Sequence, residues 1–85
     1  MLLAALSQDL YRVAESSHRG SQKVAEVFIK EALKTKEEVD IETVKPYVKV
    51  LLQKLEDTLY QSDQKQKAED ALMYSTLFQN YAQTL

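Results

Sequence analysis

Hydrophobic side chains recur along the chain at intervals of three and four residues, the spacing that places them on one face of an α-helix. Short polar stretches interrupt this pattern three times. The pattern predicts helices at about 2–16, 22–39, 44–60 and 64–83. Helices of this length joined by short turns are typical of an all-α antiparallel bundle of three or four helices, which we expect to form one domain over residues 1–85.

The boundary between the first two helices leaves two interpretations open. Gly20 and Ser21 suit a helix end and a helix start, since glycine accepts the left-handed conformation and serine is a preferred N-cap. However, if a single continuous helix is drawn through Gly20, the apolar faces of the two segments lie only about 60° apart around its axis. We favour a break or kink near residues 17–21, and a single kinked helix over residues 2–39 is the alternative.

Cap-forming residues mark the starts of the last two helices. Asp40 and Thr43 are both N-cap types, and a cap at Thr43 makes Pro46 the third helical residue. Proline is tolerated there because the first turn has no intrahelical partner for its missing N–H. Ser62 or Asp63 is expected to cap the last helix.

The last predicted helix differs from the others, because apolar side chains from Ala71 onward cover some 250° of its circumference. Such a helix is expected to be covered on more than one side, and an 85-residue chain has little material for two covering layers. We therefore expect one sector to bind a second copy of the chain, as a homodimer, or another protein. Aromatic residues at this spacing are equally consistent with a packed core. The expected contact residues are Tyr74, Leu77, Phe78, Tyr81 and Leu85.

Composition narrows the class of protein. The absence of cysteine excludes disulfides, thiolate metal sites and cysteine nucleophiles, and one glycine with one proline excludes a turn-rich β fold. The 11 basic and 13 acidic residues give a net charge of −2, which disfavours nucleic-acid binding. No apolar run approaches the ~18 residues of a membrane span, and the apolar start lacks the basic region of a signal peptide, so we expect a cytoplasmic protein with no membrane contact.

Residues capable of chemistry are few. His18 is the one histidine, and a zinc site needs three or four ligands. Neighbouring carboxylates such as Glu37 and Glu38 point about 100° apart on a helix and do not converge. We therefore expect no catalytic residue, no metal and no cofactor, and the function predicted is a non-catalytic protein–protein interaction module acting as a small adaptor or regulator.

The polar segment 17–21 supports an alternative. It resembles in part the reactive-histidine motif of histidine phosphotransfer domains, in which Lys-Gly-Ser follows the histidine, although the interval after His18 is two residues shorter. Free N–H groups at the start of the second helix favour anions, with Arg19, Ser21 and Lys23 as the candidate contacts. The alternative function is a nucleic-acid-binding or phosphorelay regulator acting through the His18–Lys23 region.

Because His18 lies between the apolar stripes, we predict that it is dispensable for folding. His18→Ala should change the free energy of unfolding by less than about 0.5 kcal/mol, as surface substitutions usually do. Urea denaturation of both proteins measures the difference. A loss of several kcal/mol would mean that His18 is a structural residue.

Overall fold

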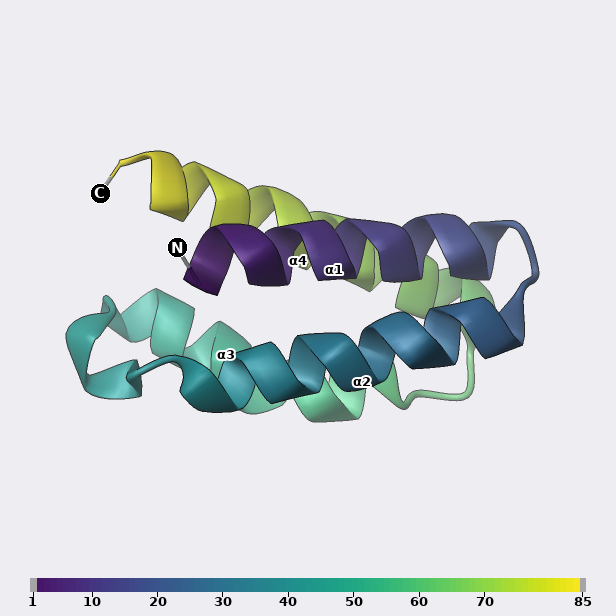
Figure 1. Cartoon of the computed structure of the whole chain (residues 1–85), viewed down its shortest axis with the longest axis horizontal. Coiled ribbons are helices and arrows are strands. Elements are labelled where there is room, and N and C mark those ends of the chain that lie inside the picture. Colours follow the sequence, from purple (N-terminus) through teal and green to yellow (C-terminus); the bar gives the residue numbers. More distant parts are fainter. Residues whose placement is uncertain (1, 85) are drawn as a thin grey trace.

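The computed structural model describes residues 2–84, which form a small all-α bundle (Figure 1). The chain runs up and down the bundle, so that α1 begins and α4 ends at the same end. The body measures 35 × 21 × 19 Å, and the all-α bundle predicted from the periodicity is confirmed. The described elements are α1 (Leu2–His18), α2 (Gln22–Glu38), the 3₁₀ turn η1 (Ile41–Thr43), α3 (Pro46–Leu59) and α4 (Gln64–Gln83).

The chain reverses between α1 and α2, so the alternative of one kinked helix is wrong. Gly20 has a φ of +79°, in the left-handed region where glycine carries no Cβ penalty. The Ser21 N–H donates to the Ser16 carbonyl at 3.0 Å and the Gly20 N–H to the Ser17 carbonyl at 3.1 Å. These two bonds form a Schellman motif, which satisfies the last carbonyls of α1 and turns the chain back along it.

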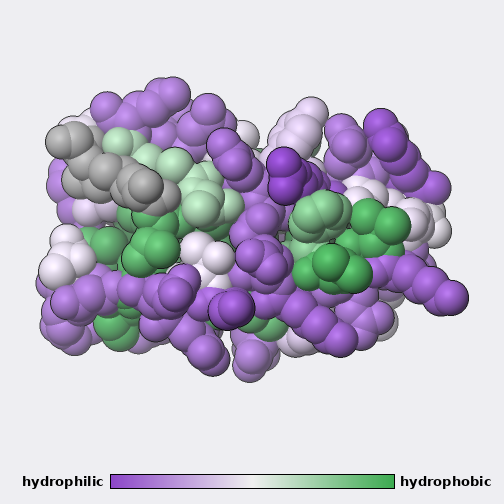
Figure 2. Space-filling model, in the orientation of Figure 1, coloured by the Kyte–Doolittle hydropathy of each residue, from purple (hydrophilic) through white to green (hydrophobic). Residues whose placement is uncertain are grey.

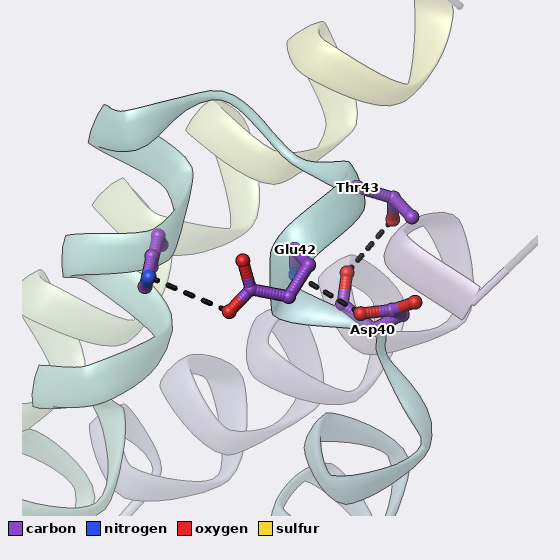
Figure 3. A network of polar contacts seen from close by, with 4 residues as sticks. Asp40, Glu42 and Thr43 are labelled. Carbon is purple, nitrogen blue, oxygen red and sulfur yellow. Dashed lines mark hydrogen bonds and ion pairs between the residues drawn. The ribbon is translucent and has the colours of Figure 1, made fainter.

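The link between α2 and α3 differs from the expected cap at Thr43 (Figure 3). The Thr43 hydroxyl donates to the Asp40 carbonyl at 2.7 Å, and the Asp40 carboxylate accepts from the Glu42 N–H at 3.0 Å. Since these groups are used in the 3₁₀ turn, α3 starts later, with Lys45 as its N-cap and Pro46 in its first turn. The third helix therefore begins two residues after the predicted start.

The turn between α3 and α4 is held by side-chain amides and carboxylates. Asp63 is the N-cap of α4 and accepts a hydrogen bond from the Gln66 N–H at 3.1 Å, which confirms one of the two expected caps. Asp70, one turn into α4, accepts from the Gln61 amide at 2.9 Å and from the Gln66 amide at 2.8 Å. The loop is thus fixed to the first turns of α4.

One apolar core runs the length of the bundle. Helix α1 packs against both α2 and α4, and α3 contacts α2 and α4 on the remaining side. The largest fully buried side chains of the core come from three of the helices. They are Leu6, Leu10 and Val13 on α1, Val48, Leu52, Leu55 and Leu59 on α3, and Phe78 on α4.

Two serines form a direct contact between α1 and α4. The Ser7 hydroxyl on α1 donates to the Ser75 carbonyl on α4 at 2.7 Å, and the Ser75 hydroxyl donates to the Ser7 carbonyl at 2.8 Å. Both residues are buried, so this reciprocal pair satisfies two hydroxyls that burial would otherwise leave without water.

Truncating a buried core side chain should lower the stability of so small a domain severely. Leu55 is fully buried, and Leu55→Ala should lower the free energy of unfolding by about 2–5 kcal/mol because it removes apolar contacts and leaves a cavity. Val50, on the same helix and 45% exposed, is the control, and Val50→Ala should cost less than about 0.5 kcal/mol. Urea denaturation measures both, and equal losses would contradict the placement of α3.

Candidate functional site

The aromatic residues of α4 lie in the core of their own chain. Tyr74, Phe78 and Tyr81 are buried and Leu77 is half-buried, while Leu85 lies outside the described residues. The expectation that this sector stays uncovered is therefore wrong. The reason is that α4 is flanked by α1 on one side and by α3 on the other, so the monomer does supply two covering layers.

Tyr81 also holds the start of α3. Its hydroxyl oxygen accepts a hydrogen bond from the backbone N–H of Lys45 at 3.3 Å. Its ring meets the ring of Tyr47 edge to face, with centroids 5.9 Å apart. Tyr81 thus joins the end of α4 to the N-cap of α3, which is a structural role for a residue expected to contact a partner.

The polar segment between α1 and α2 is a solvated turn. His18 is the last residue of α1 and is exposed, as is Lys23. Arg19 forms an exposed ion pair with Glu15, one helical turn earlier, with 3.6 Å between the charged atoms. Ser21 is the N-cap of α2 without a side-chain capping bond. The anion contact expected of Arg19, Ser21 and Lys23 stays a prediction.

A hollow of about 680 Å³ opens between α1 and α4 at the end of the bundle where α1 finishes. The hollow exists because the side chains that line its bottom are too short to fill it: Ala14, Ser17 and Ala68. Tyr11 and Leu72 flank it and are 52% and 48% exposed. Its other lining residues are polar or charged: Glu15, His18, Gln64, Lys65 and Glu69.

A second hollow of about 500 Å³ continues along the same two helices. Tyr11 and Glu15 line both hollows, and the Ser7–Ser75 pair lies at the bottom of the second. The side chain of Tyr11 therefore stands between two depressions. We call the surface formed by the residues of these two hollows the α1–α4 groove.

One polar atom at the bottom of the groove has no partner. The Oγ atom of Ser17 is buried, and no described residue forms a hydrogen bond with it. Buried hydroxyl groups nearly always have a hydrogen-bond partner in the protein or in ordered water. Because its own chain shields this atom from solvent, the described structure leaves the hydroxyl unsatisfied and out of reach of a bound molecule.

The buried carboxylate of Asp9 lies on the opposite side of α1, toward α2. Burial raises the pKa of Asp9 above its ordinary value, and the negative charge of Glu31 adds to this effect. The Arg12 guanidinium and the Thr35 hydroxyl lower the pKa of Asp9, but the net change is still a rise. Arg12 also lies over the Phe28 ring at 5.5 Å from its centroid, so this side of α1 is bound to α2.

Residues 2–84 contain no group of three or more acidic or histidine side chains placed to hold a metal ion. None of the helices in this range is long and apolar enough to cross a membrane. The arrangement that the structure does offer is an apolar depression with a polar edge, which suits binding by shape and burial.

Sequence reasoning missed the residues of the groove. Tyr11 lies off the apolar stripe of α1, and a large aromatic side chain outside the stripe was the one available signal. The place of Ala68 and Leu72 beside Tyr11 depends on how α1 and α4 cross, which the helical pattern does not specify.

Comparisons with protein-family models, with curated proteins and with solved structures give no match to this chain. The site is therefore defined by its own geometry: an apolar groove between the first and last helices of an all-α bundle.

The raised pKa of Asp9 gives a pH-dependent prediction. A carboxyl whose pKa is higher in the folded than in the unfolded state stabilises the fold below the unfolded pKa, and this contribution is lost as the pH rises through the folded pKa. Asp9→Asn, which cannot ionise, should therefore be more stable than the wild type at pH 7. Urea denaturation should show this advantage shrinking as the pH falls toward the ordinary aspartate pKa. An advantage that is constant with pH, or a reversed sign, would contradict the assignment.

Proposed function

We propose that this chain is a non-catalytic protein–protein interaction module that self-associates as a homodimer through the α1–α4 groove. The observation that carries the proposal is the pair of half-exposed apolar side chains, Tyr11 and Leu72, on either side of a 680 Å³ hollow. Interfaces are enriched in tyrosine near their centres, which favours Tyr11 as the anchor of the contact. The contact replaces the one expected through Phe78, which is fully buried in its own core.

The groove has the shape that a twofold contact requires. In a twofold interface the same surface patch faces itself, so every protrusion must find a depression on an identical surface. The α1–α4 groove carries both, since Tyr11 stands directly beside the hollow floored by Ala14 and Ala68. Two copies related by a twofold axis each place one ring in the hollow of the other.

The size of the molecule is compatible with this contact. The side of the bundle formed by α1 and α4 spans its longest and shortest axes, 35 × 19 Å, or about 670 Å² in projection. A standard interface buries ~800 Å² on each partner. A second copy lying along the groove uses the side formed by α1 and α4, whereas a small contact at one end of the bundle would fall short of this area.

Another apolar surface is less suited to the role. Figure 2 shows apolar side chains gathered in two areas of the face that carries α1 and α2, with polar side chains between them. Val24 and Val27 of α2 are exposed on the protein surface. Neither valine lines one of the two hollows, and single exposed apolar residues are normal on monomers.

The charge-introducing variant Leu72→Glu tests self-association. We expect the wild type to be a dimer at micromolar concentration in sedimentation equilibrium. Leu72→Glu should raise the dissociation constant about a hundredfold, because burial of each of two symmetric leucines contributes roughly 1.5 kcal/mol. The circular dichroism spectrum should be unchanged, because Leu72 is 48% exposed.

Val50→Glu is the matched control. Val50 is 45% exposed and lies on α3, away from the groove, so this variant should dimerise like the wild type. A wild type that stays monomeric overturns the homodimer. Equal dissociation of the two variants would place the contact elsewhere.

A further inference from the structure

Helix α2 buries less apolar side chain than the other three helices. The largest fully buried side chains come from α1, α3 and α4, whereas the buried residues of α2 are Ala25, Ile29, Ala32 and Thr35. Most contacts of α2 are with α1, few are with α3, and the described backbone of α2 does not approach that of α4. Segments that bury little apolar surface open locally at a lower free energy than the rest of a fold. The contact with α1 therefore decides whether α2 stays packed.

A buried carboxyl lies in this contact. Asp9 stands about halfway along α1, is 9% exposed and faces α2. Two residues of α2, Glu31 and Thr35, act on its carboxyl group. A carboxylate buried between two helices destabilises their contact when it is charged, because water no longer solvates the charge. The charge of Asp9 thus bears directly on the attachment of α2.

We infer that Asp9 is a pH-sensitive latch between α1 and α2. The protonated carboxyl keeps α2 packed on α1, and the ionised carboxylate favours the opening of α2 while the other three helices stay folded. The latch does not depend on the self-association proposed above, because Asp9 lines neither hollow of the α1–α4 groove.

The pKa of Asp9 differs between the closed and the open state. In the closed state burial raises this pKa, and the negative charge of Glu31 raises it further. Opening of α2 exposes the carboxyl to water and carries Glu31 away, so the pKa returns toward its ordinary value. The free energy of opening is therefore greatest below the ordinary aspartate pKa, and it falls as the pH rises through the raised pKa of the closed state.

The other groups around Asp9 leave this direction unchanged. The Arg12 guanidinium on α1 attracts the ionised carboxylate, and the Thr35 hydroxyl also lowers the pKa, but the net change in the closed state is a rise. Helix α4, the other helix packed on α1, carries no charged side chain after Asp70, and this uncharged part of α4 runs beside Asp9. Helix α3 makes no backbone approach to α1 in the described structure. The charges that act on the latch are therefore those of α1 and α2.

Cysteine labelling of the full chain under native conditions tests the latch, because the wild-type sequence contains no cysteine. Ala32→Cys places a thiol at a fully buried position of α2, where it reacts with dithiodipyridine only after α2 opens. The labelling rate, divided by the rate of the urea-unfolded protein at the same pH, gives the opened fraction. We expect this fraction to rise severalfold as the pH is raised from the ordinary aspartate pKa to pH 7. Ala25→Cys, at a second buried position of α2, repeats the measurement with a different label.

Ala71→Cys is the matched control for opening of the whole fold. Ala71 is also an alanine without exposed surface, but it lies on α4. If α2 opens by itself, the opened fraction at the Ala32 label should exceed the fraction at the Ala71 label at pH 7. Circular dichroism confirms that each labelled variant is folded before the reagent is added.

Charge-removing substitutions in the Ala32→Cys variant identify the group responsible. Asp9→Asn cannot ionise, so the opened fraction should stay low at pH 7 and lose most of its rise with pH. Glu31→Gln removes the neighbouring negative charge and should also lower the opened fraction at pH 7. Glu37→Gln, at an exposed position of the same helix, is its control and should leave the fraction unchanged.

Each outcome has one meaning. An opening of α2 that rises with pH, exceeds the opening at the Ala71 label and is suppressed by Asp9→Asn supports the latch. Equal opened fractions at the two labels mean that α2 opens only with the whole fold, and they overturn the latch. An opening that does not rise with pH, or a rise that persists in Asp9→Asn, overturns it as well. Self-association is measured separately by sedimentation and stands or falls on that result.

Discussion

The bundle depends on the pairing of its first and last helices. Ser7 and Ser75 are separated by 68 positions in sequence, yet each hydroxyl donates to the backbone carbonyl of the other residue. Larger side chains at these two positions would push α1 and α4 apart. Because α1 also packs against α2, the position of α1 between α2 and α4 encloses the core, and α3 closes the remaining side.

The close approach at the serines has a consequence at the other end of the same pair of helices. There the facing residues are again small, Ala14 and Ala68, but a hollow of about 680 Å³ lies between the helices. Small residues thus have two effects in this pair of helices. Ser7 and Ser75 allow contact with the backbone of the facing helix, whereas Ala14 and Ala68 leave space that the chain itself does not fill. Tyr11 and Leu72 remain half-exposed at its edges as a result.

The last helix shows why an apolar circumference does not by itself identify an interface. Its tyrosines and Phe78 are covered by α1 and α3, and the Tyr81 hydroxyl accepts from the Lys45 N–H at 3.3 Å. A tyrosine can be buried in this way when the core supplies a donor for its oxygen. Four of the nine large apolar side chains that are exposed among the described residues lie on α1 and α4: Leu2, Tyr11, Leu72 and Met73.

The sequence by itself determined the helices, because apolar periodicity and local caps act within a few residues of one another. The four helical segments, the turn at Gly20 and the cap at Asp63 follow from such local rules. The third helix starts later than predicted because the Thr43 hydroxyl donates to the Asp40 carbonyl and the Asp40 carboxylate accepts from the Glu42 N–H, which forms a 3₁₀ turn in place of a cap at Thr43. Only the tertiary structure decided which apolar sectors are covered, since Phe78 becomes core and Tyr11 becomes surface through the crossing of α1 and α4. That crossing is set by contacts between residues far apart in the chain, which the helical period of a single segment does not encode.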